Sequence, residues 1–503
     1  MAKQIAFFYR YLSLLMLLFM STQQVFASSN NLAVNDQRTV QVAVTDIPQY
    51  LSPYAHNPLP DQYSHLFFDP LVRWGKDKKI EYRLLEKLKM VHSTKIRFYL
   101  KNKIYFHSGN LMTSKDVIWS VNQALKKKYL EQKLQHSIKT TAINQFQFDI
   151  ESQLTQAQLL DYLTHVFILD SAFYKKNKID HNSTQKNLLS PIKQLPLSGT
   201  GPYKLSAFYA DVNLTVQENT HYWQQSPAVK RLNFLRIKSP DSRLYALLAN
   251  DIDISEDIAD KKINSLDLSG NKDIYQTSTI NTLFLTINEQ QNTIFSREIA
   301  RNAIHLAINQ AGILKHILND TGAIERIFRV NNPSSQLPNY DVKRAKTILK
   351  KINAPKEVSL LLMAEQSSSM QEVVFALTNM LKKVGITLKV TEADTVQKWR
   401  ELQFSHDLTL AMWESSLIEE SLIYQDIFTN SLLADYLTLQ FTSEDKPLTI
   451  EDKIAQFEML QEKDKIIPLF SKNKIWATDS QFDLTELFSI NGIPYWHQLS
   501  IID

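Results

Sequence analysis

The sequence predicts a mixed α/β protein with at least two lobes, and three observations support this prediction. The chain has 503 residues, which is more than one ordinary hydrophobic core accommodates. Segments in which apolar and polar residues alternate, as is typical of strands, occur between amphipathic helices along most of the chain. The segment MQEVVFALTNMLKKVGITLKV predicts an α/β unit, in which Gly385 ends a helix before an alternating strand.

The composition is that of a globular protein, with 44% hydrophobic and 21% charged residues. The formal net charge is +4 and no run of five like charges occurs, so we expect no nucleic-acid partner. The chain contains no cysteine. Disulfides, thiolate catalysis, cysteine-bound zinc and iron–sulfur clusters are therefore excluded.

The first 27 residues have the pattern of a cleavable signal peptide. Lys3 and Arg10 precede an apolar run at 12–20, and Val25 and Ala27 fit the signal-peptidase rule, which predicts cleavage after Ala27. The alternative is an N-terminal membrane anchor, but the run is shorter than the ~20 residues that span a bilayer. Because no cysteine is available for lipid attachment, we expect a free periplasmic protein and not a lipoprotein.

The first elements of the mature chain are predicted by alternation and capping. RTVQVAV is expected to form a strand, and KIRFYLKNKIYF two short strands. Thr113 can then cap a helix, with Asp116 as the capping-box partner. Its buried stripe is expected to contain Val117, Ile118, Val121 and Leu125.

The later elements follow the same two patterns. Alternation predicts strands in VNLTVQEN, RLNFLRI and NTLFLTINEQ, and SRLYALLANDIDIS predicts a helix that turns into a short strand. The segments SREIARNAIHLAINQAGILKHIL and NYDVKRAKTILKKI predict a helix pair and a further amphipathic helix. The C-terminal segments KIIPLFSKNKIWATDSQFDL and SINGIPYWHQL are expected to be extended.

None of the candidate motifs has the set of residues that a catalytic or metal site requires. His107, between Phe106 and the turn Ser108–Gly109, has no second histidine or carboxylate at ligand spacing, and a turn-bonding structural role is favoured. SGTGPY matches neither the nucleophile elbow nor the phosphate-binding loop, and is expected to be a tight connection. We therefore expect neither enzymatic activity, nor a metal site, nor a cofactor.

Several segments in series resemble the bacterial extracellular solute-binding proteins of family 5, the peptide/nickel class that serves ABC importers. One match is YLKNKIYFHSGNLMTSKDVIWSV, and a second is GTGPYKLSAFYADVNLTVQENTHYW. The other matches keep the order of the family and comprise LLANDIDIS, REIARNAIHLAIN, YDVKRAKTIL, LKKVGITLKV, HDLTLAMW and IIPLF.

The resemblance implies a two-lobed α/β periplasmic-binding-protein fold of type II, with an extra subdomain and a two-segment hinge. Lobe I is expected to comprise 38–58, 193–280 and 475–503, the extra subdomain 59–192, and lobe II 281–474. The hinge is expected near STINTLFLTIN and KIWATDSQF. Such lobes close over a ligand, and closure is a population shift.

The ligand-contacting positions implied by the resemblance depart from the pattern of the peptide-binding members. In those members an aspartate three residues after a strand-end tryptophan pairs with the ammonium group of the peptide. Here the tryptophan is Trp413 and the third residue on is Ser416, which cannot supply that charge. Glu414, Glu419 or Glu420 could replace it. The expected site further includes Trp399, Arg400 and Tyr54.

The resemblance predicts a periplasmic receptor that captures an oligopeptide or similar small solute and delivers it to the permease of an ABC importer. The alternative is a ligand-sensing module of the same fold without a transport partner, favoured by Ser416. An exported hydrolase is disfavoured because no nucleophile–base–orienter set is present. A monomer is expected.

Overall fold

The computed structural model describes residues 38–502 apart from 56, 127–137, 180–196, 260–261, 264–269, 291–292, 325–339, 365–368 and 442–446. The chain divides into two units, 1–39 and 40–503, and the lobes described below belong to the second. The predicted signal peptide, with its cleavage after Ala27, lies outside the described residues. None of the helices in the described ranges is long and apolar enough to cross a membrane.

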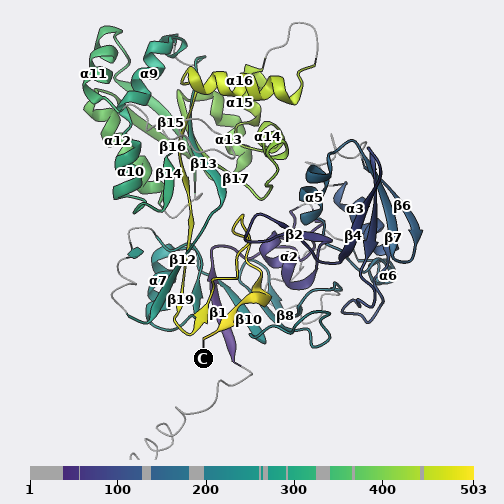
Figure 1. Cartoon of the computed structure of the whole chain (residues 1–503). Helices are drawn as coiled ribbons and strands as arrows, with labels where there is room; N and C mark the ends of the chain where they lie inside the picture. Colours follow the sequence, from purple (N-terminus) through teal and green to yellow (C-terminus); the bar gives the residue numbers. More distant parts are fainter. Residues whose placement is uncertain are drawn as a thin grey trace, which may run out of the picture. The chain divides into compact units, whose positions relative to one another are not determined.

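A seven-stranded mixed sheet forms the first lobe, called lobe I, with strand order β12-β19-β11-β1-β10-β9-β8 (Figure 1). β1 and β11 run parallel, whereas β11–β19, β12–β19, β9–β10 and β8–β9 are antiparallel. The elements are β1 (Thr39–Val44), β8 (Tyr203–Tyr209), β9 (Asn213–Glu218), β10 (Arg231–Arg236), α7 (Pro240–Leu248), β11 (Ile254–Ser255), β12 (Lys272–Thr277) and β19 (Lys474–Asp479). The strands predicted in RTVQVAV, VNLTVQEN and RLNFLRI are confirmed.

The chain between β1 and β8 adds a subdomain with a four-stranded antiparallel sheet, β4-β5-β7-β6. Helix α3 packs on the inner face of this sheet, against β6 and β7. The elements are α2 (Asp61–Phe67), β2 (Val72–Trp74), β3 (Ile80–Tyr82), β4 (Leu85–His92), β5 (Lys95–Leu100), α3 (Ser114–Ala124), β6 (Ile138–Asn144), β7 (Gln147–Ser152), α5 (Gln156–Thr164) and α6 (Ser171–Lys176).

The start of α3 matches the sequence prediction. The backbone N–H and the hydroxyl of Thr113 both donate to Asp116 Oδ2, at 2.9 and 2.8 Å. Val117 and Val121 are fully buried in the core of the subdomain. A cap of this kind stabilises a helix by about 1 kcal/mol, and the buried stripe fixes which face packs inward.

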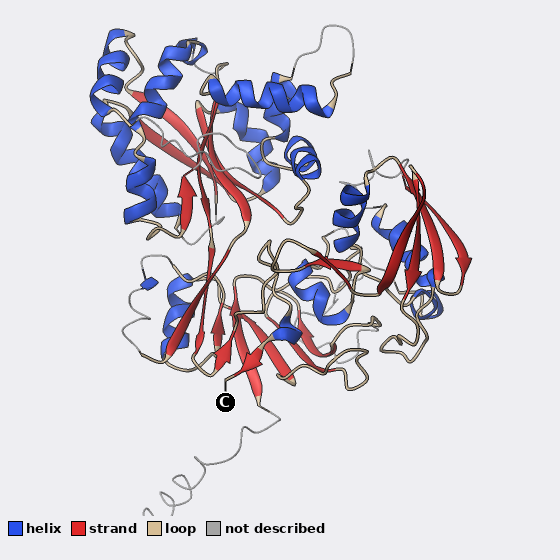
Figure 2. Ribbon diagram, viewed as in Figure 1, coloured by secondary structure: helices blue, strands red, loops and turns tan. Residues whose placement is uncertain are grey.

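A six-stranded mixed sheet, β14-β18-β13-β17-β15-β16, forms lobe II, and helices cover both of its faces (Figure 2). The first elements are β13 (Ile280–Ile287), η2 (Thr293–Ser296), α9 (Glu298–Ala307), α10 (Gln310–His316), β14 (Gly322–Ile324), α11 (Val342–Lys351), β15 (Glu357–Met363) and α12 (Met370–Lys383). They are followed by β16 (Thr387–Ala393), α13 (Val396–Leu402), η3 (Gln403–Ser405), β17 (Leu408–Ser415), α14 (Glu420–Thr429), α15 (Ala434–Gln440), α16 (Ile450–Glu462) and β18 (Ile466–Lys472). The predicted α/β unit around Gly385 is confirmed as α12 followed by β16.

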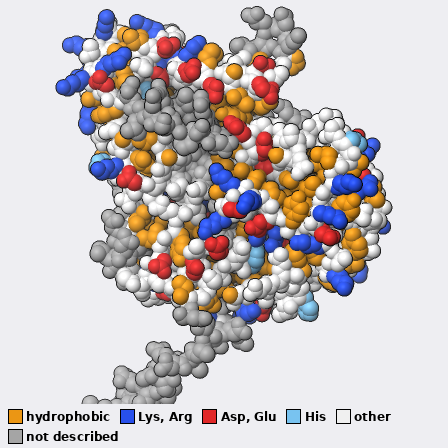
Figure 3. Space-filling view, viewed as in Figure 1, with side chains coloured by type: hydrophobic (Ala, Val, Ile, Leu, Met, Phe, Trp, Pro, Cys, Tyr) orange, Lys and Arg blue, Asp and Glu red, His pale blue; other side chains and the backbone are white. Residues whose placement is uncertain are grey.

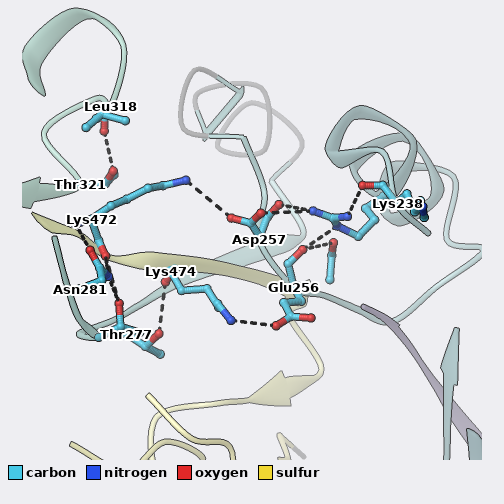
Figure 4. A network of polar contacts seen from close by, with 12 residues as sticks. Lys238, Glu256, Asp257, Thr277, Asn281, Leu318, Thr321, Lys472 and Lys474 are labelled. Atoms are coloured by element: carbon cyan, nitrogen blue, oxygen red, sulfur yellow. Dashed lines mark hydrogen bonds and ion pairs between the residues drawn. The ribbon is translucent and has the colours of Figure 1, made fainter. Parts of the chain in front are cut away.

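The chain crosses between the two sheets twice, from β12 to β13 and from β18 to β19 (Figure 1). Asn281 joins the two crossings, because its Nδ2 donates to the carbonyl of Lys472 at 2.6 Å and its Oδ1 accepts from the N–H of Lys472 at 2.8 Å. Ion pairs then tie the second crossing to lobe I: Lys472 to Asp257 at 3.6 Å and Lys474 to Glu256 at 3.0 Å (Figure 4). The two predicted hinge segments thus lie side by side.

The two most recognisable sequence motifs meet in one corner of lobe I. The backbone N–H of His107 donates to the carbonyl of Gly199 at 2.8 Å, and its Nε2 bonds the carbonyl of Gly201 at 2.9 Å. His107 therefore bonds a turn, as the sequence predicts. Burial lowers the pKa of His107 to about 4, so the ring is neutral and Nε2 donates. The C-terminal residues complete the lobe with β20 (Phe482–Asp483), η4 (Trp496–Gln498) and β21 (Ser500–Ile501).

Candidate functional site

A cavity of about 810 Å³, called the cleft below, lies where lobe I, its subdomain and lobe II meet. Its volume is within the range of small-molecule sites in proteins. Lobe I and its subdomain contribute Pro58, Leu59, Pro60, Asp61, Gln62, Ala124, Tyr162, His165, Asn491, Gly492, Ile493 and Pro494. The crossings contribute Thr279 and Lys474, and lobe II contributes Arg400, Glu414, Ser415, Ser416, Leu417, Asp426, Thr429 and Asn430.

Three of the residues predicted from the sequence line this cleft. Glu414 and Ser416 lie at the end of β17 and just after it, and both are exposed to solvent. Glu414 is paired in register with Asn281, so the end of this strand is fixed beside the first crossing. Arg400 lines the cleft from α13, where its guanidinium forms an ion pair with Asp435 at 3.3 Å.

The other four predicted residues do not line the cleft. Trp399 and Trp413 are 1% and 4% exposed and pack in the core of lobe II, while Tyr54 is buried in lobe I, where its hydroxyl donates to the carbonyl of Phe167. Glu419 is the N-cap of α14, and its carboxylate accepts from the N–H groups of Ser421 and Leu422. A direct ligand contact for these four residues stays a prediction.

Asp426 is a carboxylate of the cleft that was not predicted from the sequence. It lies on α14, where Oδ2 accepts from Trp413 Nε1 at 3.2 Å and Oδ1 accepts from Asn430 Nδ2 at 2.8 Å. Burial raises the pKa of Asp426 above its usual range. Trp413 does not line the cleft itself but orients a cleft carboxylate 13 residues further along the chain.

The cationic side of the cleft is already neutralised by the protein. The Glu256 carboxylate, at 3.0 Å, raises the pKa of Lys474 above its usual range, and Glu414 adds to the effect. Elsewhere in the lining, His165 Nδ1 contacts Asp61 Oδ2 at 2.5 Å. Among the described residues that line the cleft, the lysine and the arginine, Lys474 and Arg400, are thus both held by carboxylates.

The charges of the cleft favour a ligand that carries an ammonium group or several N–H donors. Glu414 and Asp426 are carboxylates that line the cleft outside the ion pairs described above. A buried or half-buried ammonium requires such a counter-charge. Among the residues that the structure describes, no group of three His, Cys, Asp or Glu side chains could hold a metal ion.

The face of the molecule seen in Figure 3 shows basic and acidic side chains of the described residues interspersed with one another.

Four residues of the cleft, Asp61, His165, Asp426 and Lys474, were not predicted from the sequence, because each reaches the cleft from a different part of the chain. Only their common position in space, not a local pattern, marks them as site residues.

Comparisons of the sequence with known proteins agree with this architecture. The chain is 21% identical to the nickel-binding protein NikA of Staphylococcus aureus over 351 residues, which cover 68% of each chain. It is 25% identical over 220 residues to the periplasmic murein peptide-binding protein MppA of Escherichia coli (strain K12), covering 41% of this chain and 40% of that one.

Solved structures of similar fold are two-lobed binding proteins. NikA of Staphylococcus aureus, in complex with Ni(L-His)2, superposes with a TM-score of 0.71 at 17% identity, covering 92% of this chain and all of that one. The dipeptide binding protein of Pseudoalteromonas sp. SM9913, in complex with Met-Leu, superposes with a TM-score of 0.73 at 14% identity over the same shares. The predicted two-lobed α/β fold is thereby confirmed.

The family model described as bacterial extracellular solute-binding proteins, family 5 Middle, matches residues 79–431. The match includes the subdomain from β3 onward, the first crossing, and β17 and α14, which carry Glu414 and Asp426. The chain therefore belongs to the bacterial extracellular solute-binding proteins of family 5.

Proposed function

We propose that this protein captures an oligopeptide or a similar small solute in the cleft and delivers it to the permease of an ABC importer. The observation that carries this proposal is the 810 Å³ cleft at the meeting point of the lobes, which is lined by Glu414 and Asp426. In this proposal the two carboxylates receive the ammonium group of the ligand, in the role that Ser416 cannot fill. The protein acts by binding and carries out no chemical step.

The proposal includes the location and the division of the chain. The protein is exported by its signal peptide and works in the periplasm as a monomer. Lobe I consists of residues 38–58, 193–280 and 475–503. The subdomain then covers 59–192 and lobe II covers 281–474. The two crossings, joined by Asn281, act as the hinge.

A second candidate is a ligand-sensing module of the same fold that has no transport partner. The observation in its favour is Ser416, which lines the cleft where peptide-binding members of the family place an aspartate. Both candidates require a ligand in the cleft, and they differ only in whether the closed form docks on a permease.

A peptide ligand is expected to stabilise the protein against heat, and variants in the cleft are expected to abolish this effect. At a concentration 100-fold above its dissociation constant, a ligand adds about 2.7 kcal/mol to the free energy of unfolding. Asp426→Asn is expected to weaken binding by tenfold or more, since a half-buried ammonium loses its counter-charge. Glu414→Gln is expected to weaken it less, because Glu414 is exposed. The measurement is the melting temperature with and without a pool of di- to pentapeptides.

The matched control is Glu420→Gln, because Glu420 is exposed on the first turn of α14 and is not part of the cleft. This variant is expected to respond to peptides like the unmodified protein. Acetylating the peptides at their N-termini is expected to remove most of the stabilisation. Equal stabilisation of all three variants by the same pool would show that the ligand binds elsewhere.

A further inference from the structure

Asp161 is a buried carboxylate that the proposed function does not use. It lies on α5 of the subdomain with 0% of its surface exposed. One oxygen, Oδ1, accepts from Trp74 Nε1 at 2.6 Å, within the same part of the molecule. Burying a carboxylate costs several kcal/mol unless hydrogen bonds compensate for the lost hydration, so the partners of the second oxygen are informative.

The second oxygen of Asp161 binds the other lobe. Oδ2 accepts from the backbone N–H groups of Ile418 and Glu419 of lobe II, at 2.9 and 2.8 Å. Hydrogen bonds to an ionised carboxylate are about twice as strong as neutral ones.

Two further hydrogen bonds hold the same loop of lobe II from lobe I. Gln158 Nε2, one turn before Asp161 on α5, donates to Ser421 Oγ at 2.7 Å. Asn491 Nδ2 donates to the carbonyl of Ser416. The loop from Ser416 to Ser421 is therefore held at both of its ends and in its middle by residues of lobe I and its subdomain.

We propose that Asp161 is a clasp that fastens lobe I to lobe II and holds the cleft closed. When the lobes separate about the hinge, the hydrogen bonds between the carboxylate and the two backbone N–H groups break, and each group binds water instead. This contact therefore exists only in the closed form. The clasp also positions the segment Glu414–Leu417, which lines the cleft immediately before Ile418. Closure is thereby stabilised by the protein itself, whichever solute it binds.

The clasp has a calculable effect on binding. The apparent dissociation constant equals the intrinsic one divided by the fraction of molecules in the binding-competent closed form. Removing two charge-assisted hydrogen bonds is expected to raise the open-to-closed ratio at least tenfold. Asp161 is therefore a positioning residue for the cleft rather than a ligand contact.

The proposal can be tested with spin labels attached to two introduced cysteines, because the chain has no cysteine of its own that would also be labelled. Two cysteines, introduced as Lys89→Cys on the exposed edge of β4 and Phe375→Cys on α12, where Phe375 is 70% exposed, carry spin labels on opposite lobes. The measurement is the distance distribution between the labels by pulsed EPR, in protein refolded after removal of small molecules. It needs no ligand, so its outcome is independent of the proposed function.

In the labelled protein we expect one narrow distribution, and in Asp161→Asn a second component at longer distance. The amide group of asparagine is isosteric but uncharged, and whichever way it is turned its NH2 group faces a donor, either the indole N–H of Trp74 or the two backbone N–H groups of the clasp. Trp74→Phe is the matched control, because it removes only the bond to Oδ1 and leaves the contact between the lobes intact. This control is expected to keep the narrow distribution.

Gln158→Ala is the second variant, since Gln158 is only half-buried and its replacement leaves the core intact. It is expected to produce a smaller open component, even if Asp161→Asn fails to fold. Unchanged distances in Gln158→Ala and in folded Asp161→Asn would overturn the proposal. Equal opening by Trp74→Phe would also overturn it, because the effect would then come from packing within the subdomain.

Discussion

Replacing either Gly199 or Gly201 with alanine is expected to lower the free energy of unfolding by about 3 kcal/mol. A Cβ atom at Gly199 would lie 2.1 Å from the carbonyl oxygen of Phe67, and one at Gly201 would lie 2.4 Å from the carbonyl carbon of the same residue. Both neighbours are backbone atoms at the end of α2, which cannot move without displacing the helix. The measurement is chemical denaturation of each variant.

Gly75→Ala is the matched control for this prediction. A Cβ atom there would meet the ends of the Glu81 and Asp77 side chains, with Glu81 Oε1 at 2.8 Å, and these side chains can turn away. Its expected cost is well below that of the other two substitutions. Equal costs at all three positions would contradict the view that close approach of two backbones explains the glycines of the GTGPY motif.

Lowering the pH from 7 to 5 is expected to destabilise the protein through buried histidines. Burial lowers the pKa of His65 to about 3 and that of His107 to about 4, from the ordinary value of 6.5. Between pH 6.5 and 4 the unfolded chain therefore binds protons that the folded chain does not, and stability falls as the pH falls. At pH 5 each histidine is expected to cost about 2 kcal/mol.

His107→Gln isolates one of these contributions. Glutamine keeps an N–H donor for the carbonyl of Gly201 but does not titrate, so the loss of stability from pH 7 to 5 is expected to shrink by about 2 kcal/mol. An unchanged slope in His107→Gln would contradict the assignment of His107 as a neutral donor.

Much of the local structure could be predicted from the sequence, because it depends on neighbouring residues. The cap formed by Thr113 and Asp116 and the helix end at Gly385 are set by side chains within a few positions of one another. The resemblance to the family supplied what local patterns cannot, namely the two lobes and their order. The turn-bonding role of His107 was also predicted, although its partner lies 94 residues away, whereas its neutral state follows from the burial that the structure shows.

The candidate site was harder to predict, since alternation shows that a side chain is buried but not what buries it. Trp413 and Trp399 are predicted to contact the ligand, and the structure places both in the core of lobe II, outside the lining of the cleft. The residues that line the cleft beside Glu414 come from several separate elements. Asp161 accepts a hydrogen bond from Ile418, which lies 257 residues further along the sequence. Contacts of that separation depend on how the lobes meet, which no local pattern encodes.

Native mass spectrometry of the protein, purified under gentle conditions from the organism that makes it, tests the central claim most directly. We predict a fraction of molecules that carry an adduct of one to several amino acids in mass, present in Glu420→Gln and absent or much reduced in Asp426→Asn. A bare mass in every preparation, together with no change of melting temperature in any peptide pool, would contradict a solute-binding role for the cleft.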